Sequence, residues 1–242
     1  MNFMKRNWLK SRWIGTPPLK AGELLRPSKQ VKQGLVMGMR LAVLEEQAAA
    51  VMADGHLVAV FLPGAYQLEQ DKMPPLKVDA KCDWLYPAQL YFLNLAAETN
   101  KPWLPQEPLL TRDPERGLVQ LTLCGNYDAQ VENAAMFMQS MVLEHSFFDW
   151  PALHGHLTDR LNGLAVSLLA HNKIAIARLD KMKEKIALTL QQEINYELRG
   201  SGLTIRALRI QTLEVHPLMQ HLLQEQQDYL SFNQAMRHSI MG

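Results

Sequence analysis

The chain has 242 residues, 48% hydrophobic and 20% charged, which is enough apolar material for a full core and excludes an intrinsically disordered protein. Its two cysteines exclude a disulfide scaffold and predict reduced thiols in a cytoplasmic protein. No apolar run approaches the roughly 20 residues of a spanning helix, so we expect neither a membrane-spanning segment nor a secretory leader.

The net charge of +1 conceals a basic amino-terminal segment. Residues 1–33 hold eight lysines and arginines against one acid, Glu23, whereas the remaining 209 residues hold 17 bases and 23 acids. We predict that residues 1–34 form a basic, aromatic arm for an anionic partner, either a lipid surface or a nucleic acid; a solvated tail is the other interpretation. The candidate membrane anchors are its interleaved basic and aromatic residues, Phe3, Lys5, Arg6, Trp8, Lys10, Arg12 and Trp13.

Two conflicting signals meet in the next segment. The composition of residues 41–53 favours a helix, whereas Asp54-Gly55 is typical of a two-residue hairpin turn. We predict the hairpin, with a strand over residues 56–62 and a second turn at Pro63-Gly64. We expect a loop over 71–87, a short strand over 88–94, and no long regular element over the proline-spotted residues 98–116.

Apolar and polar residues alternate over positions 118–131, which predicts a long half-buried strand in an antiparallel sheet. Helices are expected over 134–144, from an N-cap at Asp149 to about His171, and over 174–198, ended by Gly200 and Gly202. The last strand, 203–215, changes the phase of its alternation twice, which suggests bulges. This order of elements predicts an α+β fold.

A final amphipathic helix is predicted from Pro217, over residues 218–242. Its apolar arc is wide, and we expect it to be covered either by another chain or by the protein's own domain. The candidate oligomer or partner interface consists of Leu218, Leu222, Tyr229, Phe232, Met236 and Ile240.

Sequence motifs give little sign of catalysis or metal binding. His154 and His156 point apart on a helix, so they are interpreted as surface histidines rather than as metal ligands. Gly200-Ser201-Gly202 follows a helix and precedes a strand, the reverse of the order in a phosphate-binding loop. We therefore predict no catalytic residue, no metal and no cofactor.

Three segments together carry a family resemblance. The run from Leu41 to Val58, followed by Pro63-Gly64-Ala65-Tyr66, resembles the opening hairpin of SPFH (Band 7) domains, the relatives of stomatin, prohibitin and flotillin. The segment from Arg112 to Val119, leading into the strand to Tyr127, is similar to the bacterial virion-core-protein-like branch. The segment from Gly202, closing at Val215-His216-Pro217, resembles the last strand of the same domain, and the resemblance covers about residues 38–217.

The resemblance implies an α+β SPFH-like domain over residues 35–217 that self-associates at membranes, scaffolds other proteins and catalyses no reaction. The sequence departs from it by lacking an amino-terminal hydrophobic anchor and a long coiled coil after the domain. We therefore expect a cytoplasmic scaffold, peripheral to a membrane, that forms homo-oligomers and organises client proteins. The alternatives are a nucleic-acid-associated protein that uses its basic arm, and an enzyme whose site is assembled from distant residues.

Overall fold

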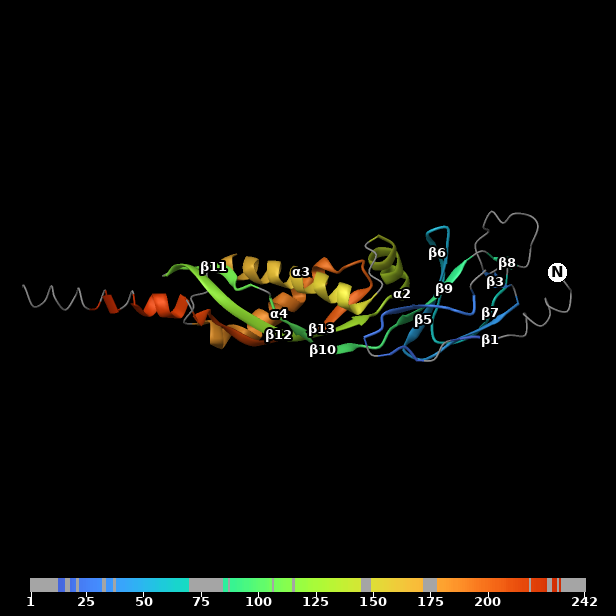
Figure 1. Cartoon of the computed structure of the whole chain (residues 1–242), viewed down its shortest axis with the longest axis horizontal. Helices are drawn as coiled ribbons and strands as arrows, with labels where there is room; N and C mark the ends of the chain where they lie inside the picture. Colours follow the sequence, from blue (N-terminus) through green and yellow to red (C-terminus); the bar gives the residue numbers. More distant parts are fainter. Residues whose placement is uncertain are drawn as a thin grey trace, which may run out of the picture. The chain divides into compact units, whose positions relative to one another are not determined.

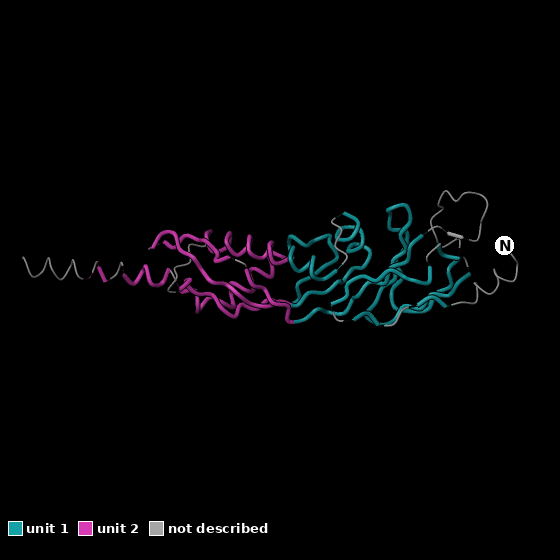
Figure 2. Tube along the Cα trace, viewed as in Figure 1, with its two compact units in different colours: residues 1–99, 128–156, 195–206 teal, residues 100–127, 157–194, 207–242 magenta. Residues whose placement is uncertain are grey.

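The computed structural model describes residues 13–15, 18–20, 22–31, 34–36, 38–69, 85–86, 88–105, 107–114, 116–144, 149–171, 178–217, 219–225, 228–229 and 231. These residues belong to two compact units (Figure 2). Unit 1 comprises residues 1–99, 128–156 and 195–206, and unit 2 comprises residues 100–127, 157–194 and 207–242.

The chain has the α+β fold that the sequence predicts (Figure 1). Its helices are α2 (Ala134–Phe137), continued by the π-helix η2 (Met138–Glu144), then α3 (Trp150–His171) and α4 (Leu179–Glu197). The strands are β1 (Trp13–Ile14), β2 (Leu25–Pro27), β3 (Leu35–Val36), β4 (Arg40–Val43), β5 (Gln47–Ala53), β6 (His56–Phe61), β7 (Gly64–Gln67), β8 (Leu85–Tyr86), β9 (Gln89–Asn94), β10 (Glu98–Trp103), β11 (Leu109–Asp113), β12 (Gly117–Val131) and β13 (Leu203–Val215).

The hairpin predicted at Asp54-Gly55 is confirmed. Strands β5 and β6 pair antiparallel, and both turn residues have positive φ, 50° at Asp54 and 76° at Gly55. Strand β5 lies between β6 and β9, and its residues 47–51 are all buried. A strand buried on both faces shows no alternation in sequence, which explains why its alanine-rich composition also favours a helix.

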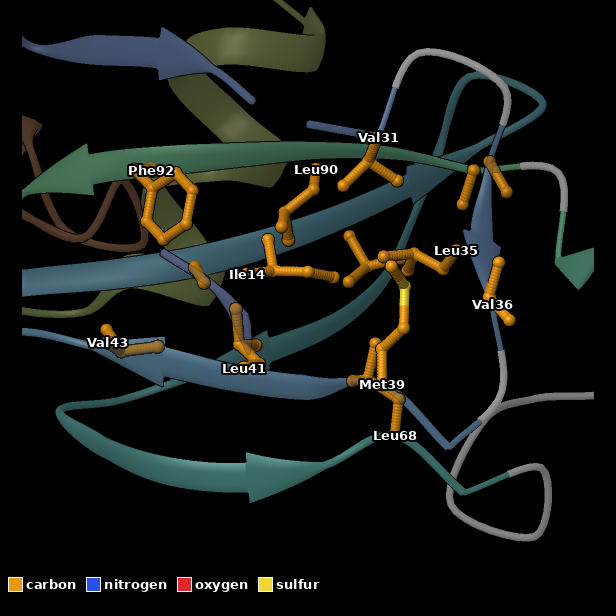
Figure 3. Close-up of a cluster of buried hydrophobic side chains, with 14 residues drawn as sticks. Ile14, Val31, Leu35, Val36, Met39, Leu41, Val43, Leu68, Leu90 and Phe92 are labelled. Atoms are coloured by element: carbon orange, nitrogen blue, oxygen red, sulfur yellow. The ribbon is translucent and has the colours of Figure 1, made fainter. Parts of the chain in front are cut away.

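Three sheets build unit 1, in the strand orders β1-β4-β7, β2-β9-β5-β6 and β3-β8. The pairing is antiparallel except between β1 and β4, which are parallel. Side chains from the first two sheets meet in one apolar cluster that includes Ile14, Leu41, Val51 and Phe92 (Figure 3). Alternate residues of β5 point to the opposite face from this cluster. Helix α2 contacts β5 and β6, and η2 contacts β6.

The described part of the basic amino-terminal segment is packed into this unit. Ile14 and Leu24 are fully buried and Val31 is nearly so, and strands β1 and β2 pair with β4 and β9. The described residues between 13 and 31 therefore contribute to the sheets and core of unit 1, although their sequence suggests an arm.

Strand β12 shows the alternation that the sequence predicts, because its odd-numbered residues from Val119 to Val131 are buried and the even-numbered ones are half-buried. Strand β13 pairs with it, with its buried residues at 203, 205, 208, 213 and 215, so the phase changes twice. The amide N–H of Glu132 donates to Gly202 and that of His216 donates to Gln120. Between these two hydrogen-bonded pairs β12 advances by twelve positions, from 120 to 132, and β13 by fourteen, from 202 to 216. Strand β13 therefore has two extra residues, as two bulges require.

The helices agree with the predicted spans. Residues 134–144 are helical, with a π-helical second half, and Asp149 caps α3 by accepting from the amide of Ala152 at 2.9 Å. Helix α3 buries every third or fourth residue, and Trp103 is held against it in unit 2 by an indole N–H bond to Asn162 at 2.8 Å. Helix α4 begins at Leu179 and buries Ile186, Leu190 and Ile194 of its predicted apolar row. The predicted start near residue 174 lies outside the described part of the chain.

Gly125 marks a close approach between β12 and β13. A Cβ added there would collide with the carbonyl oxygen of Arg209, in the stretch where β13 changes phase. We expect Gly125→Ala to lower the free energy of unfolding by about 1–3 kcal/mol, because the two backbones must separate to admit the methyl group. Urea denaturation followed by circular dichroism measures the change.

Gly163→Ala is the matched control, because Gly163 lies on the exposed side of α3 and an added Cβ meets nothing within 4 Å. It should raise the free energy of unfolding by about 0.5–1 kcal/mol through helix propensity. An unchanged urea midpoint for Gly125→Ala would show that the close approach does not exist.

Candidate functional site

Two surfaces of unit 2 expose apolar side chains next to charged ones. The first is the outer face of the β11–β12 hairpin, formed by the even-numbered residues of both strands. Leu110 and Leu118 are 49% and 62% exposed there, whereas Leu109 and Leu121 on the other face are buried. In the antiparallel register Arg112 lies directly opposite Leu118, and Leu110 opposite Gln120, so the two leucines are diagonal neighbours beside Arg112. We call Leu110, Arg112 and Leu118 the hairpin patch.

The tip of the hairpin is held by Asp113. This residue is 4% exposed, and its carboxylate accepts from the amide of Arg116 at 2.8 Å. Asp113 is therefore turned inward, and the charged residues exposed in the described part of the hairpin, Arg112 and Arg116, are both basic.

The second surface belongs to the C-terminal helix, which begins where β13 ends. The amide of His216 is bonded to β12 at Gln120, and the described residues from Pro217 onward are helical (Figure 1). The Gln220 side chain donates to the carbonyl of Val215 at 2.9 Å and ties the first turn to the strand. The helix thus starts beside the part of β12 that carries the hairpin patch.

None of the described residues of this helix is buried. Leu222 and Tyr229, two of the predicted interface residues, are 58% and 68% exposed. They are seven residues apart and share one side of the helix. The other four predicted interface residues, Leu218, Phe232, Met236 and Ile240, lie outside the described residues.

Glu225 lies on the same side as these two apolar residues, three positions after Leu222 and four before Tyr229. It is exposed, and its carboxylate is 3.4 Å from the ring of His221, one turn earlier. We call Leu222, Glu225 and Tyr229 the helix face. The apolar pattern of the sequence predicts the leucine and the tyrosine of this face but not the carboxylate between them.

The hairpin patch was also missed, although the sequence holds a signal for it. The even-numbered residues of β12, such as Gln120 and Thr122, form its polar side. Leu118 is also even-numbered, so it is an apolar residue on the polar side. The two strands had to be paired before Leu110 could be placed beside it.

Of the predicted membrane-anchor residues, Trp13 alone lies in the described part of the chain. It is in β1 and 47% exposed, and the guanidinium of Arg40 lies 5.6 Å from the centre of its ring. Phe3, Lys5, Arg6, Trp8, Lys10 and Arg12 lie outside the described residues.

An ion pair between Glu23 and Arg26 neutralises one of the positive charges of the amino-terminal segment. The carboxylate of Glu23 forms a salt bridge with Arg26, and its second oxygen accepts from Arg26 Nε at 2.7 Å. The hydrogen bond from Arg26 lowers the pKa of the Glu23 carboxyl, and the amide of Lys20 adds a smaller effect.

No group of three or more metal-ligating side chains occurs among the residues that the structure describes. The rings of His154 and Trp150 lie 5.5 Å apart, on consecutive turns at the start of α3. Ser201, in the glycine-flanked turn after α4, bonds locally to the carbonyl of Leu198 and the amide of Leu203. Within the described ranges, no helix is both long and apolar enough to cross a membrane.

Comparison with models of protein families identifies the family of this chain. The model described as SPFH domain-Band 7 family matches residues 26–229, and the chain belongs to this family. The matched range begins within β2 and includes the hairpin patch and the helix face. A comparison with curated proteins found no match.

The Glu23–Arg26 pair makes stability depend on pH. Because the pKa of Glu23 is lower in the folded protein, its charge stabilises the fold above the carboxyl's ordinary pKa, and this contribution is lost as pH falls through the folded value. We expect Glu23→Gln to lower the free energy of unfolding at neutral pH by less than about 1 kcal/mol, and the difference from the parent to vanish in acid.

Thermal melts across that pH range measure the effect. Glu45→Gln is the matched control, since Glu45 is an exposed glutamate in the β4–β5 turn of the same unit. A difference between Glu23→Gln and the parent that persists in acid would contradict an ionic role for Glu23.

Proposed function

We propose that this SPFH domain protein is a non-enzymatic, membrane-associated scaffold that forms homo-oligomers and organises client proteins. Family membership supports the general role, and the exposed helix face is the observation that carries self-association. The similarity of residues 112–119 and the following strand to the virion-core-protein-like branch supports placing it in that branch. We propose that it works in the cytoplasm, peripheral to a membrane, without metal or cofactor.

The C-terminal helix is the proposed site of self-association. Leu222 and Tyr229 together leave a large apolar area in water, and burying a large apolar side chain contributes roughly 1.5–3 kcal/mol. No described residue of this helix is buried against its own domain, which favours a second chain over packing within the same chain.

Substitution of the helix face tests self-association. We expect the double variant Leu222→Asp, Tyr229→Asp to have a lower mass by light scattering than the parent, because two charges replace the apolar contacts. Leu188→Asp is the matched control, since Leu188 is 59% exposed on α4 in the same unit. An unchanged mass, with a circular-dichroism spectrum like that of the parent, would rule out self-association through this face.

The amino-terminal residues 3–13 are the proposed membrane contact. Their bases would lie near anionic head groups, and Phe3, Trp8 and Trp13 would enter the interface, so that charge and insertion act together. The partly exposed ring of Trp13 is compatible with this role. Removing residues 1–33 would be a poor test, because it also removes β1 and β2 from the sheets of unit 1.

A full-length variant with glutamine at Lys5, Arg6, Lys10 and Arg12 tests the membrane contact. We expect its affinity for anionic vesicles to fall by about 10²-fold or more at low salt, since each base near such a surface contributes about 1 kcal/mol. Sedimentation with vesicles at low and high salt measures the loss. The matched control has glutamine at four bases near the start of α4, Arg178, Lys181, Lys183 and Lys185.

Equal pelleting of the two variants would overturn the membrane contact. If the first variant instead loses binding to a single-stranded oligonucleotide and keeps its binding to vesicles, the basic segment serves a nucleic acid.

A further inference from the structure

We propose that the helix face of one copy docks on the hairpin patch of a second copy. This inference rests on the proposed self-association and names the surface that receives the helix. It makes the contact between copies heterologous, since two different surfaces meet, instead of the same surface meeting itself.

The position of Glu225 is the first argument. A carboxylate between two apolar residues must give up water when the face is covered, and this costs several kcal/mol unless a cation meets it. Two copies of the helix packed face to face would bring two such carboxylates together. The helix face therefore favours a partner surface with a base beside apolar side chains.

The hairpin patch has this composition. Leu110 and Leu118 are exposed diagonal neighbours, and Arg112 stands directly opposite Leu118 on the same outer face. The helix face consists of a leucine, a glutamate and a tyrosine, and the hairpin patch consists of two leucines and an arginine. A guanidinium can bond a carboxylate through two parallel N–H groups, which favours arginine for such a desolvated contact.

The dimensions of the two surfaces are close enough for their side chains to meet. Leu222 and Tyr229 are separated by about 10 Å along the helix axis, from the rise of 1.5 Å per residue. Diagonal neighbours across two antiparallel strands are about 7–8 Å apart, within reach of leucine and tyrosine side chains from a helix laid across them.

Arg116, exposed at the hairpin tip, adds positive charge, and Asp228, three residues after Glu225 on the helix, adds negative charge. The carboxylate of Asp228 accepts from Gln224 at 3.0 Å on the same helix. Charge complementarity therefore extends beyond the central pair and favours one orientation of helix on hairpin.

Charge reversal tests the central pair. We expect Arg112→Glu and Glu225→Arg each to lower the mass of the parent oligomer by light scattering, and the double variant Arg112→Glu, Glu225→Arg to regain it. Lys181→Glu and Glu184→Arg, at exposed positions on α4, are the matched controls and should leave the mass unchanged. A double variant that folds and stays as small as the single ones overturns the pairing.

Mixing two defective chains tests whether the contact is heterologous. Leu118→Asp damages the hairpin patch alone and Leu222→Asp damages the helix face alone, so each variant by itself should be monomeric. In an equal mixture, the intact helix of one can dock on the intact hairpin of the other, and one such contact forms per pair. We expect the mixture to show the mass of a 1:1 dimer and nothing larger.

The outcomes separate the two proposals. A parent that is monomeric at every concentration tested overturns the proposed self-association itself. A parent that assembles, together with Arg112→Glu and Leu118→Asp variants that assemble equally well, leaves self-association standing and overturns the hairpin as its receptor. A mixture that remains monomeric also overturns the helix-on-hairpin contact, because contacts within one chain or between two helices gain nothing from mixing.

Discussion

The pairing of β12 with β13 is the constraint on which the rest of the structure depends. Strand β12 runs from Gly117 to Val131 with one side buried throughout, and β11, β10 and β13 all pair with it. A strand of this length fixes the register of its neighbours, because a shift by one residue would turn every buried side chain to the wrong face. Glycine at position 125 is required because the backbone of β13 approaches there too closely for a side chain.

The two extra residues of β13 have a consequence at its far end. Strand β13 starts opposite Glu132 of the β12 side and ends opposite Gln120. Because of the two extra residues, Leu213 and Val215 near its end are buried on the same alternation as Leu203 and Ile205 at its start. The chain therefore leaves the sheet at His216, and the final helix starts next to the hairpin. The start of the final helix beside the hairpin thus follows from strand geometry and does not need a contact between the helix face and the hairpin patch.

Regular patterns were predictable from the sequence, and positions set by long-range pairing were not. The alternation over residues 118–131 and the phase changes in β13 were sufficient to place both strands, because a strand buried on one side alternates apolar and polar residues in its sequence. The hairpin at Asp54-Gly55 was recovered from turn chemistry, even though the doubly buried β5 shows no period.

The amino-terminal segment shows the limit of the same reasoning. Ile14, Leu24 and Val31 lie in stretches of only one or two apolar residues. Strands β1 and β2 have two and three residues, too few to show any periodicity. Their burial is decided by β4 and β9, which lie far along the chain. The hairpin patch was overlooked for a related reason, since Arg112 and Leu118 become neighbours only through the register of β11 with β12.

A charged residue within the helix face makes sense if selectivity matters more than affinity. An entirely apolar arc would bind many apolar surfaces, including its own copy on another chain, with little preference for geometry. A buried carboxylate makes every contact without a matching base costly, so it excludes the symmetric helix pair and most unrelated surfaces.

Since each copy carries one helix face and one hairpin patch, a contact between them leaves a free surface of each kind at the ends of any assembly. Such a contact adds copies in one direction until the rotation between neighbours closes a ring, or continues as a filament if it does not. The rotation, not the strength of the contact, would then set the number of copies in the assembly.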